Sequence, residues 1–437
     1  MKKILSIALT FTIVLSIFGG SLVFGSAKAP TTKLSYKGTI TIWDGPRWAD
    51  SKQNKYFWLE AKKAEFEKKY PGVTINIVKT PWAEMIQKLS IAVAGRAWPD
   101  ICAIDMSSGA VDRNLVQQGV LEPVDTYYTK TELTDFNTSA LNAYKANGKL
   151  YGIPTSMTVH ALLLNLDIFK AKGVIPPKNG KWTYDEFVTK MKALTANDKY
   201  GFSTYVLPGY YESWPFILMD GGYPLSADGK KYTFDSAAAI SGLQKLLDLK
   251  FKYKVAPQDM GGADVGATWK AWGSAQQRTV AVEPWATWAV ASAQTPKWKT
   301  NFMVAEYPTG KTGKSVTVSG VGGWMMFKQT DSQKKLMTAE FMKSLSNTTA
   351  QYDTAKNYGV FPTRSSAIKL NPYKNNVQMT QAQRLTKNAI ILPTNSSWKR
   401  IDEAIQRQIQ LACNGEKSAA QALKDARSTV ESIINNN

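Results

Sequence analysis

The chain has very little of the chemistry that enzymes and metal sites use most often. Among its 437 residues it carries one histidine, His160, and two cysteines, Cys102 and Cys413. No group of His and Cys has the spacing of a zinc site, and no EF-hand loop is present, so we predict no metal and no cofactor. Two widely separated cysteines do not make a disulfide framework. We expect two buried free thiols, with a single bridge as the alternative.

Long apolar runs are also scarce, and only one occurs. Residues 4–24 contain no charged side chain, follow Lys2 and Lys3, and precede the small residues of segment 26–29, which is a secretory signal pattern. This uncharged stretch of 21 residues also approaches the length that crosses a bilayer. We therefore predict that residues 1–29 are a signal peptide or an uncleaved N-terminal anchor.

Export determines where we expect the protein to work. No cysteine near the signal could accept a lipid, so attachment through a lipidated N-terminus is not expected. The protein is predicted to lie at the extracellular face of the cytoplasmic membrane or in the periplasm. It would be free there or held by its own signal helix.

Acidic residues are outnumbered in this chain. There are 54 Lys and Arg against 34 Asp and Glu, which gives a formal net charge of +20. The basic residues are scattered singly or in pairs among acidic ones instead of forming a stripe, so we do not expect nucleic-acid binding. The charge is better suited to a solvated surface near an anionic cell envelope.

Tryptophan, by contrast, is abundant, with 14 residues. Broad indole faces stack well on the apolar faces of sugar rings. A single tryptophan is nevertheless more often a packing residue than a ligand contact. The sugar-binding hypothesis therefore depends on where each tryptophan lies.

Strands alternate with helices in the first part of the chain. Residues 39–43, 73–77 and 99–104 have the pattern of strands, with amphipathic helical stripes between them. Such a β-α-β-α-β unit builds a parallel sheet with helices on both faces, and ligands bind outside the carboxyl ends of its strands. The polar and aromatic residues that follow the first and third strands are therefore site candidates: Asp44, Arg47, Trp48 and Asp105.

The same alternation restarts further along the chain. Residues 161–164 and 279–282 have strand patterns, and residues 182–194 have the pattern of a helix whose Thr183 and Glu186 stand at the spacing of a capping box. About 400 residues remain after the export segment, which is too many for one ordinary core and suits two domains. We therefore expect a two-domain α/β protein.

Short motifs follow one another in an order that resembles a known family. The resemblance is to family 1 extracellular solute-binding proteins of the maltose-binding-protein type, which are the binding subunits of ABC sugar importers. It covers essentially the whole chain after the export segment, although each motif alone is weak. The motifs are residues 66–73, 99–101, 148–154, 165–169, 182–187, 221–222, 284–285, 322–324, 359–362 and 422–425.

This resemblance implies two α/β lobes, each a mostly parallel sheet flanked by helices, with the ligand cleft between them. The lobes would close on a sugar, expected to be an oligosaccharide, and deliver it to the transmembrane subunits of an ABC permease. We expect a monomer. The implied first lobe is residues 36–154 plus about 310–357, the second is 158–306 plus about 364–437, and the hinge crossings lie near 154–159, 306–310 and 358–364.

The resemblance also implies aromatic positions in the cleft. Trp285 stands where relatives place a sugar-stacking tryptophan. Trp398 and Tyr211 match two further cleft aromatics. Trp324 follows a pair of glycines, which lets backbone approach closely and suits a cleft wall. Trp48, in the loop after the first strand, is the fifth aromatic candidate.

Polar groups would orient the sugar, because each buried hydroxyl needs a new hydrogen-bond partner. Asp44 and Asp105 are suitable acceptors, and Arg47 is a donor. Thr158 stands where some relatives place a carboxylate, and Glu283 occupies a position often held by glycine. We therefore expect Glu283 to supply the acceptor that is missing at Thr158.

Two other functions remain open at this stage. A secreted glycoside hydrolase would need two carboxylates roughly 5 to 9.5 Å apart, and either Glu283 with Asp105 or Glu212 with Asp44 is such a candidate pair. An envelope-associated glycan-binding protein is the second alternative. We expect binding without catalysis, because the resemblance extends over the whole chain.

Overall fold

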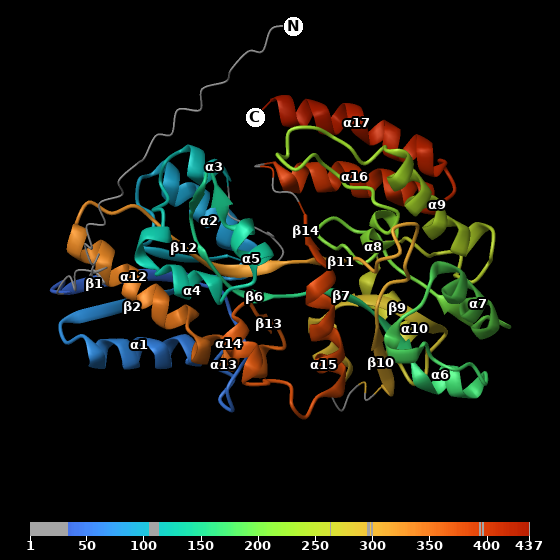
Figure 1. The fold of residues 1–437 in the computed structure, drawn as a ribbon, viewed down its shortest axis with the longest axis horizontal. Helices are drawn as coiled ribbons and strands as arrows, with labels where there is room; N and C mark the ends of the chain where they lie inside the picture. The colour runs from blue at the N-terminus through green and yellow to red at the C-terminus, as the bar shows by residue number, and fades with distance from the viewer. Residues whose placement is uncertain are drawn as a thin grey trace, which may run out of the picture. The chain divides into compact units, whose positions relative to one another are not determined.

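Two larger β-sheets organise the part of the chain that the computed structural model describes. These residues are 34–104, 113–262, 264–294, 298, 300–392, 395 and 397–436. One sheet has six strands in the order β13-β6-β12-β3-β1-β2, and the other has four in the order β10-β7-β9-β8. The α/β class expected from the sequence is confirmed, with helices packed against both sheets (Figure 1).

The six-stranded sheet begins with the predicted alternation of strands and helices. Strand β1 pairs in parallel with both β2 and β3, while β12 runs antiparallel to β3 and β6, and β13 antiparallel to β6. The sheet is therefore mixed, because later segments return to it in the opposite direction. Its strands are β1 (Gly38–Asp44), β2 (Val73–Lys79), β3 (Ile101–Ile104), β6 (Ile153–Met157), β12 (Val321–Met326) and β13 (Phe361–Pro362).

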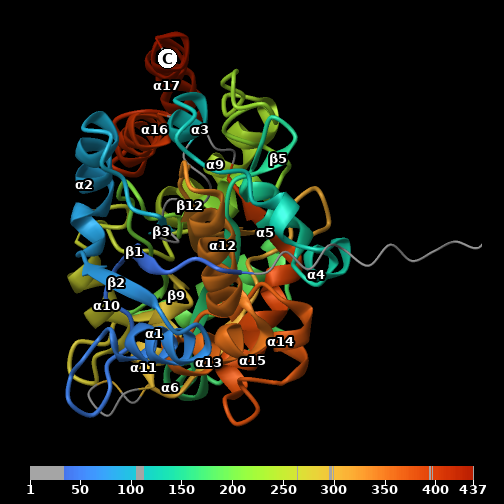
Figure 2. The same ribbon diagram turned by 90° about the vertical axis from the view of Figure 1, so that its left-hand side faces the viewer.

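Helices from both halves of the chain pack around this sheet. Helix α12 contacts β1, β6 and β12, and α1 contacts both β2 and α12 (Figure 2). The helices here are α1 (Phe57–Lys69), α2 (Trp82–Ala94), α3 (Arg113–Gln117), α4 (Lys130–Thr134), α5 (Thr138–Ala143), α12 (Ser332–Ser346), α13 (Thr348–Tyr358) and α14 (Ser365–Lys369). A small hairpin is formed by β4 (Lys145–Ala146) and β5 (Lys149–Leu150).

The four-stranded sheet is also mixed. Strand β7 runs antiparallel to β9 and β10, and only β8 and β9 are parallel. Strands β8, β9 and β10 therefore share one direction, and β7 alone runs against them. Its strands are β7 (His160–Asn165), β8 (Tyr200–Phe202), β9 (Val280–Ala286) and β10 (Phe302–Ala305).

The second sheet is buried beneath the apolar faces of its helices. Ile401, Ile405 and Ile409, one turn apart on α16, join a core with Leu162 and Leu164 of β7. Helices α16 and α17 lie side by side at the C-terminal end (Figure 1). The helices are α6 (Leu166–Ala171), α7 (Tyr184–Leu194), α8 (Trp214–Leu218), α9 (Ala237–Phe251), α10 (Val265–Gly273), α11 (Trp288–Ala293), α15 (Val377–Arg384), α16 (Trp398–Cys413) and α17 (Ala419–Asn435).

Local signals in the sequence explain where some helices begin. The predicted capping box at the start of α7 is confirmed, because Glu186 N donates to Thr183 Oγ1 at 3.2 Å and Thr183 N donates to Glu186 Oε2 at 2.8 Å. The two cysteines are buried and free, as expected. Among the described helices, none is both long and apolar enough to span a membrane.

Two of the segments that lead from one sheet to the other are hydrogen-bonded to each other. Thr158 N, between β6 and β7, donates to Gly320 O at 3.0 Å. Ser319 Oγ donates back to Thr158 O at 2.7 Å. Gly320 directly precedes β12 and follows β11 (Thr317–Ser319), which pairs in parallel with β14 (Ala389–Ile391). Two passages between the sheets are thus joined by hydrogen bonds. The lobe boundaries and hinge crossings given above stay predictions.

Candidate ligand-binding site

Trp285 lies among aromatic rings near the carboxyl end of β9. Its ring centroid is 4.7 Å from that of Trp269, 5.2 Å from that of Tyr205 and 5.8 Å from that of Trp288. The Trp285 side chain is only 1 % exposed, whereas Trp288 is 44 % exposed. We call these four residues the aromatic cluster. Trp285 pairs across the sheet with Ala161, whose small side chain lies on the same face.

Two buried carboxyl groups accompany the aromatic cluster. Glu283 lies two residues before Trp285 on β9, so both side chains point to the same face of the sheet. Glu212 follows Tyr211, and both glutamates are fully buried. Within the described part of the chain, none of their four carboxyl oxygens has a hydrogen-bond partner. Across the same described ranges, the hydroxyl of their neighbour Tyr205 is also buried without a hydrogen-bond partner.

Burial controls the protonation of these carboxyls. It raises the pKa of Glu283 well above the usual range, and the charge of Glu212 raises it further. Burial also raises the pKa of Glu212, although His160, whose Nε2 lies 3.6 Å from Oε1, partly offsets the effect. Both groups therefore hold their protons more tightly than exposed glutamates.

Helix α16 presents a stripe of polar side chains to the loop of residues 206–211. We call Trp398, Asp402, Gln406 and Gln410, which are four residues apart, the α16 stripe. Trp398 Nε1 donates to Tyr211 Oη at 2.9 Å. Asp402 Oδ2 accepts from Gly209 N at 2.6 Å, Gln406 Nε2 donates to Tyr210 O at 2.7 Å, and Gln410 Nε2 donates to Val206 O at 3.3 Å. The structure thus brings together the predicted residues Trp398 and Tyr211.

The first strand-end loop forms a second group, which we call the Arg47 group. Arg47 donates to both oxygens of Asp44, through Nε at 2.9 Å and Nη2 at 3.0 Å. Its guanidinium lies 4.9 Å from the ring centroid of Trp324, 5.6 Å from that of Trp58 and 5.9 Å from that of Trp82. Burial raises the pKa of Asp44, and Arg47 acts against that shift. Asp44 and Arg47 form a pair whose charges compensate each other.

The remaining predicted residues lie in different surroundings. Trp48 is half-buried and packs against Phe57 and Trp58, with ring centroids 5.7 and 5.8 Å away. Thr158 is buried in the bonded passage between the sheets, where its backbone groups are held by Ser319 and Gly320. Asp105 lies outside the described residues.

Sequence reasoning missed several residues that the structure places at this site. Glu212 is predicted only as a catalytic candidate, Trp58 is predicted to be a packing residue, and Asp402 and Gln406 are not among the predicted site residues. A signal existed for two of them, because Asp402 and Gln406 each follow directly after one of the isoleucines of the apolar stripe on α16. Polar residues that border an apolar stripe are often buried and need partners.

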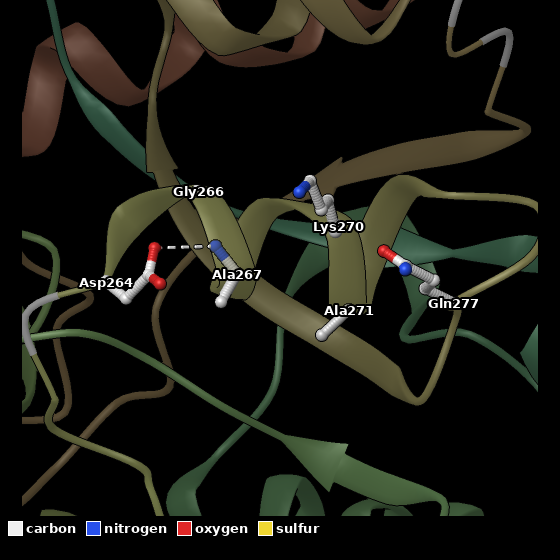
Figure 3. A pocket seen from close by; sticks show the side chains of 6 residues that line it. All are labelled: Asp264, Gly266, Ala267, Lys270, Ala271 and Gln277. Atoms are coloured by element: carbon white, nitrogen blue, oxygen red, sulfur yellow. Dashed lines mark hydrogen bonds between the residues drawn. The ribbon is translucent and has the colours of Figure 1, made fainter.

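A separate depression of about 370 Å³ lies on α10 (Figure 3). Asp264 caps this helix by accepting from Ala267 N at 2.9 Å, and Lys270 extends from the same surface. Trp269 of the same helix contacts Trp285 instead. None of the predicted site residues lines this depression, which is formed by Asp264, Gly266, Ala267, Lys270, Ala271 and Gln277.

Comparison with known proteins decides the family. The model of the bacterial extracellular solute-binding protein family matches residues 62–381, which is most of the chain. The chain belongs to this family. It is therefore an exported solute-binding protein of the ABC-transporter type and not an enzyme, as its sequence indicates.

Two curated relatives match over most of their length, and a third over less than half. A Brucella abortus protein named only as a binding protein is 27 % identical over 403 residues, covering 88 % of this chain and 91 % of the relative. The galactooligosaccharide-binding protein of Bacillus subtilis is 21 % identical over 423 residues, covering 94 % of this chain and 93 % of the relative. The arabinooligosaccharide-binding protein of the same organism is 28 % identical over 202 residues, covering 45 % and 43 %.

Solved structures share the fold at low sequence identity. The cyclic alpha-maltosyl-1,6-maltose binding protein of Arthrobacter globiformis has a TM-score of 0.78 at 20 % identity, covering 92 % of this chain and 100 % of the other. The sugar-binding protein MalE of Xanthomonas citri has a TM-score of 0.77 at 19 % identity, covering 91 % and 98 %. The expected periplasmic-binding-protein fold is confirmed.

Proposed function

We propose that this solute-binding protein captures a neutral oligosaccharide between two lobes and delivers it to the transmembrane subunits of an ABC permease. The observation that carries the proposal is the pairing of aromatic rings with buried polar groups at strand and helix ends. Trp285 is accompanied by Glu212 and Glu283, and Trp398 is bonded to Tyr211. Ring faces suit the apolar faces of sugars, while polar groups suit their hydroxyls.

The charges at the candidate site favour an uncharged ligand. Asp44 is bonded to Arg47 through both carboxylate oxygens, so neither group is free to bind an ionic partner without breaking that pair. Burial raises the pKa of both Glu212 and Glu283, which favours their neutral forms. Neutral carboxyl groups both donate and accept hydrogen bonds, as sugar hydroxyls do.

Relatives support an oligosaccharide over a monosaccharide. Two curated relatives are named as galactooligosaccharide- and arabinooligosaccharide-binding proteins. Several aromatic platforms also suit several sugar rings, since each stacked ring needs its own face. We propose that Trp285, Trp398, Tyr211 and Trp324 contact the sugar, with polar contacts from Glu283, Asp44, Arg47 and Thr158, and that Trp48 and Asp105 lie nearby.

Capture by closure follows from general thermodynamics. A ligand that touches both lobes only in the closed form shifts the equilibrium towards closure. The bonded passages at Thr158 and Gly320 are suitable places for such a hinge, because few residues join the sheets there. We propose a monomer that is free after signal cleavage or held by its signal helix; N-terminal sequencing of the secreted protein separates these two forms.

A melting-temperature screen tests the sugar proposal. The purified protein is heated with malto-, cello-, xylo-, manno-, galacto- and arabino-oligosaccharides, each over a range of concentrations. A ligand of the native state adds about 2.7 kcal/mol of stability at one hundred times its dissociation constant, so the correct glycan should raise the melting temperature progressively. Neutral monosaccharides serve as controls and should shift it less.

Two results of this screen would count against the proposal. If no soluble glycan raises the melting temperature, the chain is a family member with a different solute. If only polymeric wall material raises it, the envelope-associated glycan-binding alternative is correct instead.

A further inference from the structure

His160, the only histidine of the chain, lies where a passage between the sheets meets the candidate site. It is the first residue of β7, just after the passage that leaves β6. Strand β11 holds its backbone, because His160 N donates to Thr317 Oγ1 at 3.1 Å and Thr317 Oγ1 donates to His160 O at 2.6 Å. The residue is 6 % exposed, so the imidazole must find partners for its two nitrogens within the fold.

The two ring nitrogens of His160 face different partners. Nδ1 lies 3.1 Å from Val318 O of β11, which is a hydrogen-bond distance. Nε2 lies 3.6 Å from Glu212 Oε1, which is an ion-pair distance. A carbonyl oxygen only accepts hydrogen bonds, so the hydrogen of the first contact belongs to Nδ1. The bond to Val318 thereby determines that Nε2 is the nitrogen that faces Glu212.

A proton must lie between Nε2 and the Glu212 carboxyl. If neither group carried one, the lone pair of the ring nitrogen would face a carboxylate oxygen and the two would repel each other. Two arrangements are attractive: an imidazolium facing a carboxylate, and a neutral ring facing a protonated carboxyl. Nδ1 carries a hydrogen in both. The contacts therefore exclude the neutral ring whose hydrogen is on Nε2.

The carboxyl of Glu212 depends on this ring for attraction. In the described part of the chain, His160 is the only ion-pair partner of Glu212. Burial raises the pKa of Glu212, and His160 acts against that shift. The other titratable groups that respond to the charge of Glu212 are acids and phenols, and none of them is cationic. They are Glu283 of β9, Tyr205 and Tyr211 of the segment after β8, and Tyr307 after β10.

We propose that His160 is a positioning residue that links this passage between the sheets to the proposed ligand site. Val318 O orients the ring through Nδ1–H, and the Nε2 edge of the ring holds the Glu212 carboxyl. A solute that contacts Glu212 changes the contact with Nε2, and a movement of β11 turns the ring, so the two events are coupled. The proposal rests on the proposed function, because it takes Glu212 to lie in the ligand site. His160 acts through Glu212, without touching the solute.

The single histidine makes the ring directly observable. In untagged protein labelled with ¹⁵N only at histidine, every imidazole signal belongs to His160. The ¹⁵N spectrum shows which ring nitrogen carries a hydrogen, and this measurement needs no ligand. We expect Nδ1 to be protonated in the ligand-free wild type near neutral pH. In Glu212→Met, Nδ1 should stay protonated and the Nε2 signal should move, because a side chain of similar length replaces the carboxyl without its charge.

Two substitutions of His160 separate the two edges of the ring. In His160→Asn the side-chain amide takes the place of Nδ1 and can donate to Val318 O, but nothing replaces Nε2. In His160→Gln the longer side chain brings its amide to the place of Nε2, where it can donate to Glu212. Tyr232→Phe is the matched control for stability. It also removes a buried hydrogen bond to a backbone carbonyl, from Tyr232 Oη to Leu423 O at 2.8 Å, away from the candidate site.

The affinity measurement uses the glycan that raises the melting temperature most. We expect His160→Asn to weaken its binding about tenfold, while His160→Gln restores most of the affinity because a donor faces Glu212 again. Tyr232→Phe should lose stability and keep the wild-type affinity. The double variant of His160→Asn with Glu212→Met should bind as Glu212→Met does alone, because the ring acts through the carboxyl.

Several results would contradict the link. A neutral ring with its hydrogen on Nε2 in the folded wild type would overturn the assignment of the two ring edges, even if no variant folds. Additive losses in the double variant, or equal affinity losses in His160→Asn, His160→Gln and Tyr232→Phe, would show that His160 only packs. If the spectra follow the expected pattern and no glycan binds, the link stands and the sugar proposal fails. If glycans bind and their affinity does not respond to His160, the sugar proposal stands and the link fails.

Discussion

At the scale of single residues, the candidate site consists of aromatic side chains that are also part of the packed structure. Trp285 and Trp324 are each 1 % exposed. Replacing such a residue by alanine would create a cavity and cost about 3 to 5 kcal/mol of stability, in addition to any effect on binding. A smaller aromatic replacement separates the two effects better.

We predict that Trp285→Phe weakens oligosaccharide binding by about 1 kcal/mol, because a smaller ring offers less stacking surface. Trp272→Phe is the matched control. Trp272 is equally buried and also contacts Trp269, at 5.3 Å between centroids, and like Trp285 its indole N–H has no hydrogen-bond partner among the residues that the structure describes. Both variants should lose similar melting temperature, whereas titration calorimetry should show weaker binding for Trp285→Phe alone. Equal affinity losses in the two variants would mean that Trp285 acts only through packing.

Some residue contacts could be predicted from the sequence, and others could not. Trp285 was singled out because it follows a recognisable strand and matches a family motif. The bond between Trp398 and Tyr211 joins residues 187 positions apart, so no local pattern reveals it. The pairing of Arg47 with Asp44 is not predicted, for a different reason. The sequence predicts the two as separate ligand contacts, although a spacing of three residues lets them bind each other.

At the scale of elements, α16 depends on a buried cation at its C-terminal end. Lys250 of α9 is 5 % exposed, and its Nζ donates to Cys413 O at 2.7 Å and to Met260 O at 3.3 Å. The last carbonyl groups of a helix lack partners within the helix and carry partial negative charge. Lys250 therefore stabilises the helix that bears the α16 stripe.

We predict that Lys250→Met lowers the free energy of unfolding by about 1 to 3 kcal/mol, because two buried carbonyl groups lose their donor. The control is Lys252→Met, which removes the same charge from an exposed position two residues further along. Chemical denaturation should show a loss for the first variant and little change for the second. A stability loss of the same size in both variants would show that charge alone matters.

Elements with strong local signals were predicted, and short ones were not. The strands and helices of residues 38–104 and the capping box of α7 follow from periodicity and spacing. Strands β11 and β14 have three residues each and pair across 72 positions, from Thr317 to Ala389. Three residues are too few to show a periodic pattern in the sequence. Contacts with the rest of the fold determine that such a segment becomes a strand.

At the scale of the whole molecule, two mixed sheets are joined by passages that hydrogen-bond to each other. Thr317 Oγ1 donates to His160 O at 2.6 Å, and Ser319 Oγ donates to Thr158 O at 2.7 Å. His160 also faces Glu212, so the passage borders the buried carboxyls of the candidate site. A shift of one sheet against the other would therefore change the surroundings of the proposed ligand site.

Titration calorimetry with the glycan that raises the melting temperature most is the measurement that tests the central claim most directly. The account predicts saturable, reversible binding with a stoichiometry near one, a negative heat-capacity change from the burial of apolar ring faces, and recovery of the glycan intact. Absence of saturable heat with every neutral oligosaccharide, or recovery of cleaved glycan, would contradict it.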